Sequence, residues 1–226
     1  METFLLIAPI LLFSMVAHEY AHGYAALKQG DNTALMLGRL TWNPVKHIDP
    51  VMTILVPLVT FLGSGGHMAF GGAKPVPVNP RLYANFRRGD IIVSLAGVTV
   101  NALLAVVFAL LVIPSGLLGH AVPAMNNSLA ILQKMFMYGI AVNLVLAAFN
   151  LLPIPPLDGS HVMKHILPVS WALQYQKISR YGFFILIALL WWGRPVLNLW
   201  MAPAFGLADF GMRIVSPFVL MPTWTP

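Results

Sequence analysis

The chain has 226 residues, of which 58% are hydrophobic and 9% charged, and its net charge is +6 at pH 7. Because a soluble domain carries roughly 25% charged residues, this composition excludes an ordinary soluble protein and indicates an integral membrane protein. The basic residues lie between apolar runs instead of gathering on a soluble face, so we expect no nucleic-acid partner, and the absence of cysteine excludes disulfides, thiolate metal ligands and cysteine nucleophiles.

The first apolar run, residues 3–27, is long enough to cross a bilayer as a helix. Its only acidic, basic or histidine side chains are those of His18, Glu19 and His22. A charged group at membrane depth costs at least about 2.5 kcal/mol, so these residues predict a functional site. Residues four apart share one helix face, and the pattern H-E-x-x-H is typical of metal sites in which both histidines are ligands and the glutamate accepts a proton from water.

The next part of the chain is irregular. Residues 28–49 are polar, and a short apolar-polar alternation at residues 37–44, bounded by turn formers, favours a strand or hairpin. Residues 51–62 are apolar but too short for a span, which favours a re-entrant segment. The three prolines within residues 70–80 favour extended backbone.

The remainder alternates long apolar runs with short breaks. Residues 91–114 and 128–151 predict two spanning helices, with a loop at residues 115–127. Further helices are expected at residues 158–166, 171–192 and 196–220. The expected fold is therefore an all-α polytopic membrane protein with about five to six hydrophobic helices, a re-entrant segment and a short β-hairpin-like stretch near the active site. We expect a single domain over residues 1–226, with a catalytic core at about 1–168 and accessory helices at about 169–226.

A catalytic metal keeps three protein ligands and an open position, so one ligand is missing. Asp158 is the strongest candidate, because it follows a segment that Pro153, Pro155 and Pro156 must unwind, and non-helical backbone at membrane depth is tolerated where it lines a cavity. The alternative is that Asp158 caps the helix that follows. A metal role for any other histidine is a weaker hypothesis, with His161 the nearest rival, and Asn101 and Asn143 are expected to form interhelical hydrogen bonds.

These motifs resemble the paired signatures of the site-2 proteases, the intramembrane zinc metalloproteases of M50 type. The resemblance rests on His18-Glu19-x-x-His22 and on Asn150-x-x-Pro153-x-Pro155-x-x-Asp158-Gly159. Residues 70–80 and Leu95-Ala96-Gly97 look like the compact prokaryotic branch without a PDZ domain.

The resemblance implies one zinc ion per chain on His18, His22 and Asp158, with Glu19 as the catalytic base and Asn150 helping to position substrate or stabilise the oxyanion. It implies hydrolysis of peptide bonds within or near transmembrane segments of membrane-anchored proteins, in a prokaryotic inner membrane. Residues 72–80 could offer an edge to which an unwound substrate adds as a strand. Two other functions stay open, a metal transporter and a catalytically silent zinc-binding scaffold.

A shared metal also constrains topology, because its ligands must lie at one depth in the bilayer. The first helix and the helix at residues 128–151 must then run in the same direction, and residues 28–90 must leave from and return to one side. On this path ten of the thirteen Lys and Arg residues gather on that side, which the positive-inside rule makes cytoplasmic. They are Lys28, Arg39, Lys46, Lys74, Arg81, Arg87, Arg88, Lys164, Lys177 and Arg180.

Overall fold

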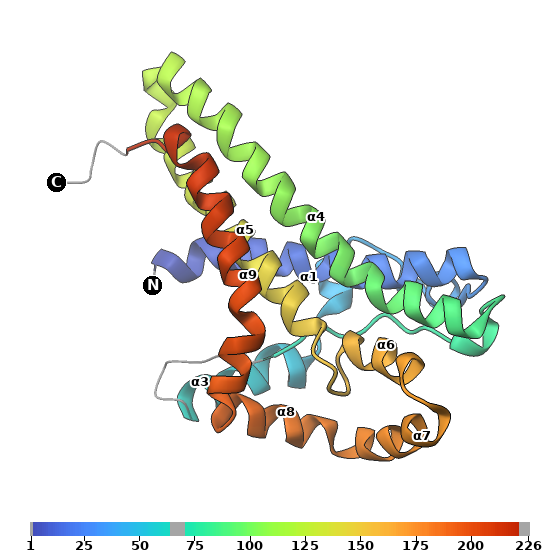
Figure 1. Ribbon diagram of the computed structural model, residues 1–226. Coiled ribbons are helices and arrows are strands. Elements are labelled where there is room, and N and C mark those ends of the chain that lie inside the picture. The colour runs from blue at the N-terminus through green and yellow to red at the C-terminus, as the bar shows by residue number, and fades with distance from the viewer. Residues whose placement is uncertain (1, 64–70, 222–226) are drawn as a thin grey trace. The chain divides into compact units, whose positions relative to one another are not determined.

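The computed structural model describes residues 2–63 and 71–221, and these residues form helices joined by turns and irregular segments (Figure 1). The α-helices are α1 (Glu2–Gln29), α2 (Thr33–Met36), α3 (Val56–Gly63), α4 (Phe86–Ala121), α5 (Asn126–Asn150), α6 (Asp158–Ile166), α7 (Val169–Ile178), α8 (Gly182–Trp191) and α9 (Arg194–Val215). Short helices of other types are η1 (Pro44–His47), η2 (Pro50–Leu55), η3 (Pro80–Leu82), η4 (Pro123–Met125), η5 (Ser179–Tyr181) and η6 (Ser216–Phe218). The chain divides into two compact units, one of Leu12–Gly97 and one of Met1–Leu11 with Val98–Pro226.

Fewer helices are fit to span a membrane than the sequence predicted. In the described part of the chain, three are long and apolar enough, at Thr3–Gln29, Phe86–Ala121 and Pro123–Asn150. A fourth is possible if the pair Val169–Trp191 and Arg194–Phe218, which is bent by 87°, counts as one span. The prediction of five to six hydrophobic helices is therefore wrong, because the last two apolar runs form one bent pair instead of two straight spans.

The predicted β-hairpin is also wrong, since no strand occurs within residues 2–63 and 71–221. At residues 37–44 the chain instead turns at Gly38, whose φ of 62° is left-handed, and then enters η1. The Asn43 side chain caps that helix by accepting from the Val45 N–H at 3.0 Å. Local capping and turn chemistry thus outweighed a weak alternation of apolar and polar residues.

The predicted loop at residues 115–127 is mostly helix. α4 continues through Pro114 as far as Ala121, and only Val122 and η4 separate it from α5. Ser115 Oγ donates to the carbonyls of Leu111 at 2.8 Å and Val112 at 2.9 Å. α4 thus continues past Pro114 without ending, as a membrane helix can.

In the unit Leu12–Gly97, α1 ends in a glycine turn. Gly30 has a φ of 109°, its N–H donates to the Leu27 carbonyl, and the Asp31 N–H donates to the Ala26 carbonyl at 2.9 Å. This pair of bonds is the Schellman pattern, in which glycine relieves the steric cost of a left-handed residue. The turn directs the buried carboxylate of Asp31 toward Asn79, whose N–H it accepts.

η2 and α3 form an excursion that leaves and returns at neighbouring points. Asp49 caps its start by accepting from the Val51 and Met52 N–H groups. After α3 the chain returns where the Gly72 N–H donates to the Met52 carbonyl at 2.9 Å. This arrangement is what a re-entrant segment requires, although its place in a bilayer stays a prediction. The predicted path also runs through residues 64–70, which lie outside the described residues.

In the other unit, α9 packs along α5 in the opposite direction (Figure 1). Trp200 Nε1 donates to the Ala148 carbonyl at 2.8 Å near one end of α5. At the other end the buried Gln133 donates to the carbonyls of Val112 and Phe218, both at 2.9 Å, and accepts from the Leu220 N–H at 2.8 Å. α9 therefore extends from the Asn150 end of α5 to its Asn126 end.

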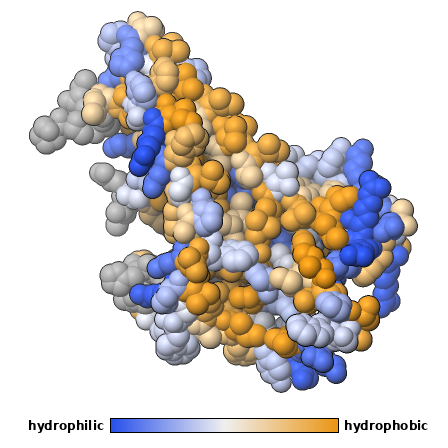
Figure 2. All heavy atoms as spheres, viewed as in Figure 1, coloured by the Kyte–Doolittle hydropathy of each residue, from blue (hydrophilic) through white to orange (hydrophobic). Residues whose placement is uncertain are grey.

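Much of the visible surface is hydrophobic, as Figure 2 shows. On α4, for example, Leu103, Val106 and Leu110 are all more than half exposed. Large apolar surfaces of this kind are not stable against water in a soluble monomer, so they fit helices that face lipid.

Candidate metal centre

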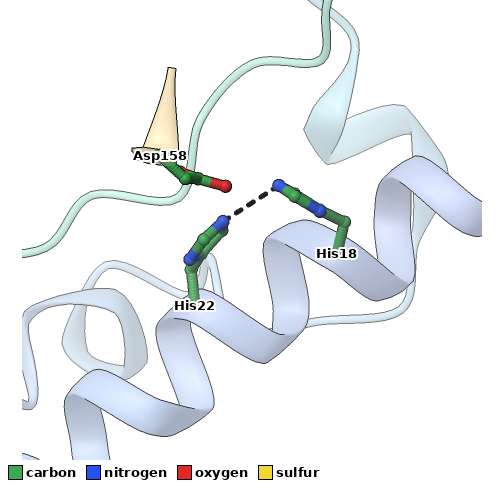
Figure 3. A group of neighbouring side chains, drawn as sticks. All are labelled: His18, His22 and Asp158. Atoms are coloured by element: carbon green, nitrogen blue, oxygen red, sulfur yellow. Dashed lines mark hydrogen bonds between the residues drawn. The ribbon is translucent and has the colours of Figure 1, made fainter. Parts of the chain in front are cut away.

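The two histidines of H-E-x-x-H lie together on one face of α1, as the helical spacing predicted (Figure 3). Their Nε2 atoms are 3.0 Å apart, and the His18 side chain is buried. Two imidazole nitrogens bound to one tetrahedral zinc ion at about 2.0–2.1 Å would be about 3.3 Å apart. The pair is therefore close to the geometry in which both rings bind one ion through Nε2.

His22 is oriented by a backbone carbonyl of α4. Its Nδ1 lies 2.7 Å from the Val93 oxygen, and because a carbonyl can only accept, Nδ1 carries the proton. The lone pair of a neutral His22 is then on Nε2, the atom nearest His18. A second hydrogen bond of this kind fixes the tautomer and ring orientation of a metal-binding histidine.

Gly97, also on α4, keeps the space beside both imidazoles free. A Cβ atom at this position would lie 2.5 Å from His18 Cε1 and 2.5 Å from His22 Nε2. Such distances are well inside van der Waals contact, so any larger residue would displace the histidine rings. From the sequence, Gly97 is only part of a motif, and no residue-type signal predicts this role.

Asp158 is the first residue of α6 and follows the irregular residues 151–157, which the prolines were expected to unwind. The alternative that it is the capping residue of α6 is wrong, because the capping position is Leu157. Asp158 is the carboxylate that could complete a metal-binding group with His18 and His22 (Figure 3). Two imidazoles and a carboxylate are a donor set typical of catalytic zinc.

Glu19, the expected base, is held by the segment that returns from the excursion. Its Oε2 accepts a hydrogen bond from the backbone N–H of Val76 at 2.7 Å. This contact is not predictable from the sequence, since a backbone donor 57 residues away leaves no residue-type signal. Asn150, the other expected catalytic residue, donates from its amide to the Leu146 carbonyl at 2.9 Å within α5.

The other described histidines are not grouped with further His, Asp or Glu residues that could hold an ion. His47 is buried and its Nε2 contacts the Thr41 carbonyl at 2.9 Å. His161, the nearest rival, has its Nδ1 3.4 Å from Lys164 Nζ. His67 lies outside the described residues.

Comparison with known proteins identifies relatives over most of the chain. The family model described as Peptidase family M50 matches residues 6–192. A Bacillus subtilis protein named "Putative zinc metalloprotease YwhC" is 38% identical over 180 residues, which cover 79% of this chain and 77% of that protein. A Mycolicibacterium smegmatis protein of the same description, Rip2, is 31% identical over 201 residues, covering 87% of this chain and 70% of the relative. No solved structure gives a significant match.

Proposed function

Because the chain belongs to Peptidase family M50, and is thus a membrane zinc metalloprotease by family, we propose that it cleaves peptide bonds within or near transmembrane segments of membrane-anchored proteins. The observation that carries the proposal is the convergence of the His18 and His22 Nε2 atoms on α1, a helix apolar and long enough to cross a membrane. A catalytic site on a membrane-spanning helix is reached from within the bilayer, which favours a membrane-embedded substrate.

In the proposed mechanism, His18, His22 and Asp158 hold one zinc ion per chain. When bound, the ion supplies Lewis acidity, which allows water to ionise near neutral pH and polarises the substrate carbonyl. Glu19 accepts the proton of the attacking water and returns it to the leaving amine. Asn150 is proposed to orient the substrate, which requires its amide to exchange the Leu146 carbonyl for a substrate group.

The proposed setting is a prokaryotic inner membrane that the chain crosses several times, with the active site toward the cytoplasm. The clustering of basic residues between the apolar helices supports this orientation. No nucleic acid is expected to take part. The partners are the lipid bilayer and a protein substrate whose helix must unwind locally, because the carbonyls of an intact helix are already hydrogen-bonded.

The test compares purified wild-type protein with Glu19→Gln for bound zinc and for cleavage of a synthetic transmembrane peptide. We expect Glu19→Gln to lower cleavage by about 10²- to 10⁴-fold, the usual contribution of a general base, with zinc retained. His18→Ala is the matched control, since it should lose both zinc and cleavage. Ion flux without cleavage in the wild type would identify a transporter, and bound zinc with neither activity would identify a scaffold.

A further inference from the structure

Residues 71–79, here called the strap, are hydrogen-bonded along their length to other residues of their own unit, Leu12–Gly97. They contain neither helix nor strand. The Lys74 N–H donates to the His47 carbonyl at 2.7 Å, and the Arg39 guanidinium donates to the carbonyls of Lys74 and Pro75. At the far end the Asn79 N–H donates to Asp31. The strap is therefore held on both sides of Val76.

Val76 is fixed by its side chain as well as by its N–H. It is buried, and its Cγ1 would lie only 2.9 Å from a Cβ atom at Gly23. Gly23 follows Glu19 by four residues and so lies on the same face of α1. The missing side chain at Gly23 thus lets the strap come close enough to α1 for the Val76 N–H to reach Glu19.

The bond from Val76 to Glu19 occupies one carboxylate oxygen, Oε2, and leaves Oε1 for proton transfer. Hydrogen bonds to a carboxylate are about twice as strong as neutral ones, and the neighbouring prolines, Pro75 and Pro77, restrict the backbone on both sides of the donor. A base that is held in one rotamer needs less reorganisation when the proton moves.

We propose that Val76 is a positioning residue, whose backbone N–H holds Glu19 in the orientation required for proton transfer. This inference rests on the proposed function, because it assigns Glu19 as the base. It differs from the expectation that residues 72–80 pair with substrate as a strand edge, since the Val76 donor is already used within the protein.

The test uses two valines in matching contexts, each preceded by a proline. Val76→Pro removes the donor to Glu19, whereas the Val78 N–H makes no hydrogen bond to any described residue, so Val78→Pro is the control. We expect Val76→Pro to lower kcat for peptide cleavage by tenfold or more, with KM and bound zinc unchanged, and Val78→Pro to stay within about threefold of wild type. Unchanged kcat in Val76→Pro, or a raised KM in both variants, would overturn the proposal, and the second result would support strand pairing.

A second pair of variants covers the case in which Val76→Pro misfolds or loses zinc. A Cβ atom at Gly23 would lie 2.9 Å from Val76 Cγ1 and 3.1 Å from Leu40 Cδ1. Gly23→Ala should therefore push the strap away from Glu19 and lower kcat. Adding Val76→Ala should restore kcat because it removes the nearer contact, while the Leu40 side chain can rotate aside. Failure of the double variant to recover would overturn the proposal.

Amide hydrogen exchange gives a readout that does not depend on activity. Exchange at the Val76 amide should be about tenfold faster in Glu19→Ala than in wild type, and close to wild type in Glu19→Gln, which keeps an acceptor. Equal exchange in all three proteins would overturn the strap proposal even if the wild type cleaves peptide. A wild type that shows this pattern but never cleaves would instead overturn the proposed function.

Discussion

At the scale of single residues, Gly97 decides whether two imidazoles can share an ion. We expect Gly97→Ala to lower bound zinc to less than about a tenth of the wild-type content, because its Cβ would lie 2.5 Å from His22 Nε2 and changes to the residues that orient metal ligands typically cost 10- to 100-fold in metal affinity. Zinc per chain, measured by atomic absorption on purified protein, checks the expectation. Gly206→Ala on α9 is the control, since no atom lies within 4 Å of its Cβ, and a normal zinc content in Gly97→Ala would show that the rings can move aside.

Asn101 and Gln133 are two buried amides with opposite hydrogen bonding. Neither polar atom of the Asn101 side chain has a hydrogen-bond partner among the described residues, contrary to the expectation of an interhelical bond, whereas Gln133 makes three bonds. An unsatisfied buried group costs about 1–3 kcal/mol. We therefore expect Asn101→Leu to raise the free energy of unfolding by about 1 kcal/mol and Gln133→Leu to lower it by about 2 kcal/mol or more. Denaturant titration of the helical circular dichroism signal measures both, and destabilisation by Asn101→Leu would contradict this account.

At the scale of elements, the turn after α1 anchors the strap through Asp31. Burial alone would raise the pKa of this carboxyl, but hydrogen bonds from Asn79 and Thr33 hold the pKa below its ordinary value. A lowered pKa in the folded state stabilises the protein above the unfolded-state pKa of about 3.9, and this stabilisation is lost as the pH falls through the lower, folded-state value.

We therefore expect Asp31→Asn to lower the free energy of unfolding by about 1–3 kcal/mol at pH 7. The difference from wild type should shrink as the pH falls below about 4, because Asp31 then takes up a proton in the unfolded wild-type chain and does so in the folded protein only at still lower pH. Unfolding titrations of both proteins across this pH range make the comparison. A difference that is constant with pH would mean that the charge on Asp31 is not what anchors Asn79.

The sequence predicted elements well where one strong local signal acted alone. The apolar run around His18 indicated α1, and the prolines before Asp158 correctly predicted that α6 begins there. The prediction of a hairpin at residues 37–44 was wrong because helix capping by Asn43 competes with a short alternation of apolar and polar residues. The prediction that the helix ends at Pro114 was wrong because a membrane helix can continue through a proline. The spacing of His18 and His22 predicted their shared face, but the Val93 carbonyl, the Val76 N–H and the space at Gly97 depend on tertiary contacts that residue types do not encode.

At the scale of the whole molecule, contacts between helix ends within one unit show the path of the chain. Met221 accepts a hydrogen bond from the Asn126 side chain at 3.0 Å, so the end of the described chain lies beside the start of α5. α9 must therefore return along α5 after the bend that follows α8. If α1, α4 and α5 each cross the bilayer, α9 supplies a fourth crossing, and residues 216–221 lie on the same side as η4.

The absence of native cysteine allows this path to be tested with single introduced cysteines. We chose three exposed positions, Leu82 before α4, Ala124 in η4 and Met221 after η6. Because α4 separates Leu82 from Ala124, and because basic residues cluster on the Leu82 side, a membrane-impermeant maleimide should label Ala124→Cys and Met221→Cys in intact cells. Leu82→Cys should react only after permeabilisation. If Met221→Cys behaved like Leu82→Cys, α8 and α9 would form a re-entrant pair instead of a broken span, and the helix that packs on α5 would then enter the membrane without crossing it.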